Sequence, residues 1–257
     1  MNPAFEEILK KGMLGLGRAV EFVIGHARKA RVKVGTASSD SLQPILAVEG
    51  QLTIQKVREL ISAGADRIVK PVIPVLVDKA AAELCDGPPV FVGLMKERGA
   101  SIAVHVDISA SGGAYPKDEG TRSHRIRAAV RNMPFEDGFF DFIVANLATP
   151  LQDDIVKAVK EAGRVLTVGG NAVVIDFHPF GNFAKKGSFR LRSVKSIVRG
   201  VEDYYKICQT AGFSLVYIRE LFIDETVRSL FATDGEKHAF RSLKDTPFLI
   251  FLMVNKK

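Results

Sequence analysis

Several short apolar runs of this sequence end beside a polar residue, and these positions could carry chemistry. Glu83, Asp107 and Asn146 each close such a run, and His178 follows Asp176 in the segment DFHP. Carboxylate and amide oxygens accept hydrogen bonds from a ligand. A histidine, whose unperturbed pKa lies near ~6.5, can act as a general base. His178 is therefore a candidate catalytic base, and the alternative is that DFHP only shapes the exit of a strand.

The elements that must position these residues alternate between strands and helices. Strands are expected at 79–84, 102–107, 125–130, 140–146, 172–177, 214–219 and 248–254, and helices at 89–98, 153–165 and 201–211. This alternation predicts an α/β fold with a mostly parallel sheet and helices on both faces. Such sheets bind ligands beyond the carboxyl ends of their strands. The site is therefore expected at 83–90, 107–110, 129–132 and 146–150.

The first 75 residues differ from the rest. Apolar residues recur at helical spacing over 5–23 and again over 54–68, with a loop expected at 35–40. Three glycines inside the first pattern make that helix dependent on packing against something else. We expect residues 1–75 to form an N-terminal helical cap and residues 76–257 to form the main domain.

The composition excludes several other classes. Of 257 residues, 47% are apolar and 25% are charged, which is typical of a globular protein and not of a disordered or coiled-coil chain. The longest apolar run, 248–254, is far shorter than a membrane span, and the first ten residues lack an apolar signal region, so a cytoplasmic location is expected. The two cysteines, Cys85 and Cys208, predict reduced thiols and no metal site.

Two longer segments carry a resemblance to a family. Residues 133–150 read MPFEDGFFDFIVANLATP, and residues 161–176 read EAGRVLTVGGNAVVID. They resemble the patterns LPFxDxSFDxVxxNxAL and ExxRVLxPGGxxxxxD of S-adenosylmethionine-dependent methyltransferases of the Rossmann-like class (methyltransferase type 11-like). The segments 201–220 and 248–257 also resemble that family, so the likeness runs from about residue 83 to the end of the chain.

The resemblance implies a seven-stranded Rossmann-like sheet, mostly parallel with the last strand antiparallel, and S-adenosylmethionine as cofactor. It places the cofactor loop in ELCDGPPVFVGLMKERGA at 83–100. Asp107 would accept the ribose hydroxyls, and Glu83 would fix the loop and the amino group. The cofactor-binding residues that it implies are Glu83, Leu84, Cys85, Gly87, Asp107, Ile108, Ala129, Val130, Asn146 and Leu147.

The sequence departs from the family pattern within this loop. Cys85 and Pro89 stand where the first and last glycines belong, and Asp86 adds a negative charge beside the expected cofactor carboxylate. Ala129 replaces the aspartate on the adenine side. Two functions therefore stay open. One is an active methyltransferase with an atypical loop, and the other is a catalytically silent relative that binds a ligand or a partner.

Two basic stretches bear on the substrate. Residues 182–200 contain six Lys or Arg and no acid, and residues 121–131 contain four Arg and one His without an acid. If they face one cleft, they favour a small anionic substrate. The alternative is a solvated surface. A nucleic-acid partner is the minor hypothesis because no aromatic stacking motif accompanies these stretches.

Overall fold

The computed structural model describes residues 54–85, 87–108, 124–148, 155–180 and 200–257. They form one seven-stranded sheet in the order β3-β2-β1-β4-β5-β7-β6. The strands are β1 (Ala80–Cys85), β2 (Ile102–Asp107), β3 (His124–Arg127), β4 (Phe140–Asn146), β5 (Leu166–Phe177), β6 (Phe213–Ile223) and β7 (Thr246–Lys256). Pairing is parallel from β3 through β5, and β7 is antiparallel to both of its neighbours. The predicted sheet is therefore confirmed.

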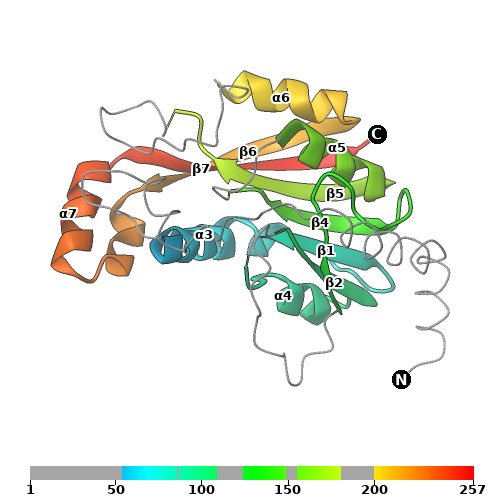
Figure 1. The fold of residues 1–257 in the computed structure, drawn as a ribbon, viewed down its shortest axis with the longest axis horizontal. Helices are drawn as coiled ribbons and strands as arrows, with labels where there is room; N and C mark the ends of the chain where they lie inside the picture. The colour runs from blue at the N-terminus through cyan, green and yellow to red at the C-terminus, as the bar shows by residue number, and fades with distance from the viewer. Residues whose placement is uncertain (1–53, 86, 109–123, 149–154, 181–199) are drawn as a thin grey trace, which may run out of the picture.

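Helices cover both faces of this sheet (Figure 1). α5 (Ile155–Val165) and α6 (Val201–Thr210) pack on one face, and α3 (Ile54–Ile68), α4 (Val92–Glu97) and α7 (Asp234–Leu243) pack on the other. Two short 3-10 helices, η2 (Lys70–Val72) and η3 (Glu225–Leu230), complete the described part. All six residues of β2 are buried, as expected for a parallel strand covered on both sides.

The helix α3 packs into the same core as the sheet. Leu60, Ile61 and Ala65 are almost fully buried and cluster with residues of β1, β4 and β7. The buried ammonium of Lys56 pairs with Glu236 of α7 at 2.9 Å. This helix matches the second predicted N-terminal helix. The first one and the loop at 35–40 lie outside the described residues, and the domain boundary at residue 75 stays a prediction.

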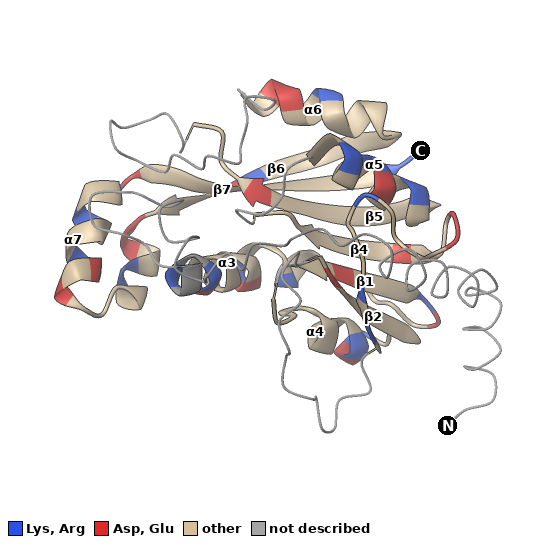
Figure 2. Cartoon of the chain, viewed as in Figure 1, with Lys and Arg blue, Asp and Glu red and all other residues tan. Residues whose placement is uncertain are grey.

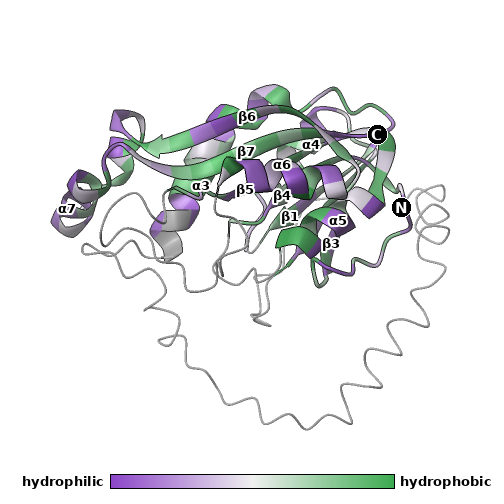
Figure 3. Ribbon diagram, turned by 90° about the horizontal axis from the view of Figure 1, so that it is seen from above, coloured by the Kyte–Doolittle hydropathy of each residue, from purple (hydrophilic) through white to green (hydrophobic). Residues whose placement is uncertain are grey.

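Hydropathy and charge follow these layers. Most Lys, Arg, Asp and Glu residues lie on helices and connections, whereas the strands carry few of them (Figure 2). The strands are mainly hydrophobic along their length (Figure 3). Among the acidic residues in the strands, Glu83 of β1 and Asp107 of β2 stand out because both are 0% exposed. Charges buried this completely require partners, and those partners define the candidate site.

Candidate functional site

Four polar residues of β1 and β2 share one face of the sheet. The parallel register places Glu83 beside His105 and Cys85 beside Asp107. Alternate residues of a strand point to the same side, so all four side chains face the layer of α3 and α4. They lie at the carboxyl ends of the two strands, where the sequence predicted the site.

Glu83 holds the beginning of α4. Its carboxylate accepts N–H groups from Val90 at 2.7 Å, Phe91 at 2.6 Å and Val92 at 3.0 Å. Burial raises the pKa of Glu83 above its ordinary value, while the three backbone donors favour the charged form. The loop between β1 and α4 is thus tied to the strand from which it departs.

The thiol of Cys85 braces the same loop. It is buried, with Sγ 3.3 Å from Nε2 of His105, 3.6 Å from the carbonyl oxygen of Gly87 and 3.8 Å from that of Pro88. The cysteine that replaces the family's first glycine therefore packs sideways, between the neighbouring strand and its own loop.

Gly87 is the one loop position, among the described residues, where the resemblance expects a glycine and the chain has one in a conformation that favours glycine. Its φ of +107° lies in a region that L side chains rarely adopt. A Cβ at this position would lie 3.4 Å from the guanidinium of Arg58, which reaches the loop from α3. The helix α3 thus brings a cation to the loop at Gly87. Asp86 lies outside the described residues.

Asp107 has two arginine partners on β3. Its Oδ2 accepts Nη2 of Arg125 at 2.8 Å and Nη2 of Arg127 at 3.3 Å. The guanidinium side chains are 35% and 45% exposed, whereas that of Asp107 is 0% exposed. The predicted ribose acceptor is therefore a buried carboxylate whose two cationic partners face the surface.

The other predicted cofactor residues divide into two groups. The side chains of Leu84, Val130 and Leu147 belong to the apolar core packed against α5 and α6, so only their main chains could meet a ligand. Ile108 and Asn146 are half-buried and Ala129 is exposed, and all three lie at or just beyond the carboxyl ends of their strands. Whether these six positions bind a cofactor stays a prediction.

His178 lies beyond the end of β5 and is held on both sides. Its Nε2 is 2.6 Å from Oε1 of Glu220, and its Nδ1 accepts the N–H of Phe180 at 3.2 Å. The side chain is 0% exposed. The proposed role as a general base stays a prediction, and it would require one of these two hydrogen bonds to open.

A second polar pair involves Asp176, two residues before His178. The hydroxyl of Tyr204 donates to Oδ2 of Asp176 at 2.7 Å and approaches the carbonyl oxygen of Phe177 at 3.0 Å. Burial raises the pKa of the Asp176 carboxyl to about 7. Tyr204 is buried, so its ring packs in the core while its hydroxyl makes these hydrogen bonds.

The polar residues of the family-like segments bind one another. Arg164 donates to both oxygens of Glu161, at 2.7 and 3.0 Å, and to Oδ1 of Asp137 at 2.6 Å. It also donates to the carbonyl oxygens of Met133 and Phe135. These residues therefore fasten the connection before β4 to the end of α5, so this part of the signature is structural.

Two further findings concern the described residues as a set. They include no group of three or more His, Cys, Asp or Glu residues placed to hold a metal ion. None of the helices within these ranges combines the length and hydropathy that crossing a bilayer requires.

Comparison with known proteins fits this architecture. Residues 86–174 match a family model described as a methyltransferase domain. An S-adenosylmethionine-dependent methyltransferase from Mesorhizobium loti is 17% identical, with a TM-score of 0.54 over 77% of this chain and 100% of that one. Geranyl diphosphate C-methyltransferase from Streptomyces coelicolor is 14% identical, with a TM-score of 0.56 over 82% of this chain and 89% of that one. No curated protein matches the chain by sequence.

The match and the fold point the same way. Residues 86–174 resemble a methyltransferase domain, and the described residues form a sheet of the Rossmann-like type. The resemblance to S-adenosylmethionine-dependent methyltransferases seen in the sequence is confirmed.

Sequence reasoning missed several partners at this edge of the sheet. Arg125 and Arg127 lie in a stretch that was singled out for its charge, but only the register of β2 and β3 pairs them with Asp107. Glu220 comes from β6, 42 residues beyond His178. Arg58 belongs to no motif. Each of these contacts joins residues that only the tertiary fold brings together, so no local sequence pattern could have predicted it.

Proposed function

We propose that the protein is an S-adenosylmethionine-dependent methyltransferase that acts on a small, acidic molecule. The observation that supports this proposal is the arrangement of strand, loop and helix over residues 80–85 and 87–97. Glu83 ties down the loop, Gly87 keeps its left-handed conformation, and Asp107 ends the adjacent strand. The family match and the S-adenosyl-L-homocysteine present in the Streptomyces coelicolor enzyme support the choice of cofactor.

The residues present fit such a cofactor. The turn at Gly87 allows a close approach of the backbone, and a side chain there would be strained. The cofactor would supply an activated methyl group. Transfer of that group is an in-line displacement, which depends mainly on holding donor and acceptor close and aligned. The chain needs to orient both molecules and exclude water, and no nucleophilic side chain is required.

Arg58 supplies a positive charge near the expected position of the cofactor carboxylate. Asp86 places a negative charge beside the expected cofactor carboxylate, and like charges so close repel unless a cation lies between them. The Arg58 guanidinium lies against Gly87, the next residue in the chain. In this proposal Arg58 offsets the charge of Asp86 and binds the carboxylate of the cofactor.

The acidic character of the acceptor is argued from Arg125 and Arg127. Both guanidinium groups are partly exposed at the carboxyl edge of the sheet, where they present positive charge to an incoming molecule. The second basic stretch, residues 182–200, lies almost entirely outside the described residues. His178 keeps its proposed place as the base near the acceptor.

The same arginines favour the second candidate, a silent relative that binds a ligand or partner at this end of the sheet. A ribose would have to share the Asp107 carboxylate with two cations. If the Asp107 carboxylate only binds Arg125 and Arg127, it is not available to a ribose. The carboxyl end of the sheet would then offer two arginines to a ligand but no nucleoside site.

Calorimetric titration with S-adenosylhomocysteine separates the two candidates. We expect the wild-type protein to bind more tightly than about 100 µM, which corresponds to ~5.5 kcal/mol. Asp107→Asn and Arg58→Gln should each weaken binding by about tenfold, because each removes a charge-assisted hydrogen bond to the ligand. Arg67→Gln, a change on the same helix, is the matched control, because Arg67 instead bonds Thr226 of η3.

The opposite results would reject the enzyme. Absence of heat from the wild-type protein, together with an unchanged melting temperature, would favour the silent relative. Binding that survives Asp107→Asn without loss would reject the ribose assignment. A melting temperature measured for each variant without ligand separates lost binding from lost folding.

A further inference from the structure

The pair formed by His178 and Glu220 lies at the carboxyl end of β5, on the face of the sheet that α5 and α6 cover. Asp176 of β5 and Glu220 of β6 are both opposite Ile250 of β7 in the sheet register. Ile250 belongs to the core packed against α5 and α6, and residues directly opposite each other face the same side. Both carboxylates therefore point toward that layer. His178 is the residue after β5, and its own N–H donates to the carbonyl oxygen of Phe248 at 2.8 Å.

The two contacts of the His178 ring determine which nitrogen carries the proton of the neutral imidazole. A backbone N–H can only donate, so Nδ1, 3.2 Å from the nitrogen of Phe180, must offer a lone pair. An ionised carboxylate can only accept, so Nε2, 2.6 Å from Oε1 of Glu220, must carry the hydrogen. Both contacts require the same tautomer, with the proton on Nε2 and the lone pair on Nδ1.

These two hydrogen bonds differ in strength. The contact between Nε2 and Glu220 is short and charge-assisted, and such bonds are roughly twice as strong as neutral ones. The contact between Nδ1 and Phe180 is longer and joins two neutral groups. Phe180 is also 50% exposed, although its ring lies 5.4 Å from that of His178. The bond at Nδ1 is therefore the one that opens more readily.

Glu220 can compensate a positive charge on the buried ring. The His178 side chain is 0% exposed, whereas that of Glu220 is 41% exposed and stays in contact with water. An imidazolium buried without a partner is costly, and a carboxylate at hydrogen-bond distance offsets that cost. Asp176, the other acid on this face, binds the hydroxyl of Tyr204 of α6. Glu220 is thus the carboxylate that serves His178.

A structural tie between strands does not account for this pair. β5 and β6 are not neighbours, because β7 lies between them and pairs with both over most of their length. These two ladders already fix the positions of the strands. Burying a titratable ring against a carboxylate costs desolvation and adds little to such an arrangement. The pair therefore fits a role in the chemistry of His178 better than a role in holding the sheet together.

We propose that Glu220 is the positioning residue of His178 and that Nδ1 is the nitrogen that accepts a proton. This rests on the proposed function, in which His178 is the base near the methyl acceptor. When the N–H of Phe180 moves away, Nδ1 is free to take the proton that leaves the acceptor. The resulting imidazolium keeps its Nε2–H bound to the Glu220 carboxylate. Glu220 itself gains no proton and acts only through His178.

The test is NMR of the ring nitrogens of His178 in the full chain, recorded where the imidazole is neutral. The signals are assigned by their loss in His178→Gln. We expect the wild type to show one tautomer, with the proton on Nε2. Glu220→Gln keeps an oxygen that accepts from Nε2 and should retain this tautomer, whereas Glu220→Leu removes the acceptor and should give a mixture of both. The control Glu202→Leu changes an exposed acid of α6 and should match the wild type.

Amide hydrogen exchange tests which bond opens. The N–H of Phe180 should exchange at least about tenfold faster than that of His178, which donates to Phe248. Equal protection of the two amides would overturn the assignment of Nδ1. A proton on Nδ1 in the wild type, or an unchanged tautomer in Glu220→Leu, would overturn the role of Glu220. A melting temperature for each variant separates a lost tautomer from lost folding.

None of these measurements needs a cofactor, so the two proposals fail in different ways. A wrong tautomer in a protein that binds S-adenosylhomocysteine would overturn the role of Glu220 and leave the methyltransferase proposal intact. Absence of S-adenosylhomocysteine binding in a protein with the expected tautomer would overturn the methyltransferase, and with it the catalytic meaning of the pair.

Discussion

Two buried carboxylates at the candidate site are satisfied by different partners. Glu83 accepts backbone N–H groups, which fix a loop and leave little freedom. Asp107 accepts hydrogen bonds from two arginine side chains that are partly exposed. At the residue scale, Glu83 is therefore a structural anchor, and Asp107 is the acid whose partners a ligand could exchange.

Asp176 gives a prediction about pH. The pKa of its carboxyl is about 7 in the folded protein against an ordinary 3.8, so the folded state binds more protons than the unfolded state between these values. Stability should therefore fall as pH rises through this window. Asp176→Asn removes the effect, and relative to that variant the wild type should lose about 2 kcal/mol between pH 5 and pH 8.

Urea unfolding of both proteins at the two pH values measures this difference. Asp234→Asn, which changes a fully exposed carboxylate of α7, is the control and should follow the wild type. Parallel pH curves for the wild type and Asp176→Asn would contradict the raised pKa.

At the scale of elements, buried apolar runs could be predicted from the sequence, whereas polar extensions could not. The bounds expected at 102–107 and 140–146 agree with β2 and β4 because these strands are covered on both sides. β5 begins at Leu166, six residues before the predicted start, since Gly169 and Gly170 suggest a turn and not a strand. β6 and β7 also extend beyond their predicted ends, toward η3 and α7.

The helix α7 was missed although it has a local signal. Thr233 accepts the N–H of Glu236, and the Glu236 carboxylate accepts the N–H of Thr233, which together form a capping box. This T-x-x-E pattern stands in the sequence and marks a helix start. The apolar side of the helix is short, so hydrophobic periodicity alone did not reveal it. The contact of Arg58 with the loop has no comparable signal.

The packing of α5 against α6 gives a second stability prediction. Gly163→Ala would gain up to about 1 kcal/mol of helix propensity. The new Cβ would meet a backbone carbonyl at 2.7 Å, and such overpacking costs about 1–3 kcal/mol. Because a backbone atom yields less readily than a flexible side chain, we expect net destabilisation of about 1 kcal/mol.

The control is Gly235→Ala in α7, where a Cβ would meet nothing within 4 Å. Thermal unfolding should show Gly163→Ala below the wild type and Gly235→Ala equal to it or above it. A stabilised Gly163→Ala would mean that α5 and α6 lie farther apart than described.

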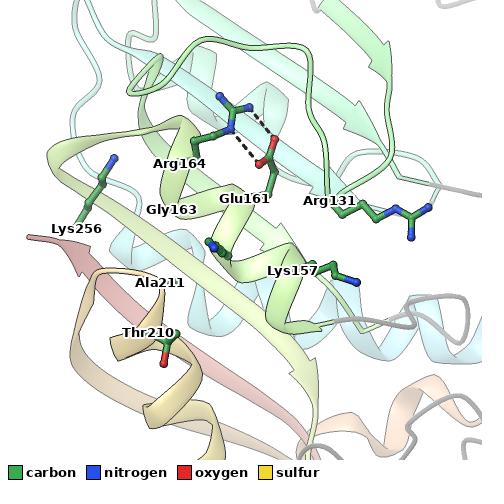
Figure 4. Close-up of a pocket in the computed structure, with 9 residues that line it drawn as sticks. Arg131, Lys157, Glu161, Gly163, Arg164, Thr210, Ala211 and Lys256 are labelled. Atoms are coloured by element: carbon green, nitrogen blue, oxygen red, sulfur yellow. Dashed lines mark hydrogen bonds and ion pairs between the residues drawn. The ribbon is translucent and has the colours of Figure 1, made fainter. Parts of the chain in front are cut away.

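At the scale of the whole molecule, charged residues are distributed unevenly over the fold. The carboxyl end of the sheet carries two buried acids, held by backbone N–H groups and by two arginines. A hollow between α5, α6 and β7 is lined by five Lys or Arg residues and one Glu (Figure 4). Part of the net charge of +7 therefore lies on this face.

The most direct measurement is a crystal structure of the protein grown with S-adenosylhomocysteine. The account predicts electron density for the nucleoside between the loop at 87–91 and the end of β2. The ribose should lie at the Asp107 carboxylate and the amino-acid part near Arg58. A crevice filled by Cys85, Arg125 and Arg127, with no nucleoside in it, would contradict the proposed methyltransferase while leaving the fold unchanged.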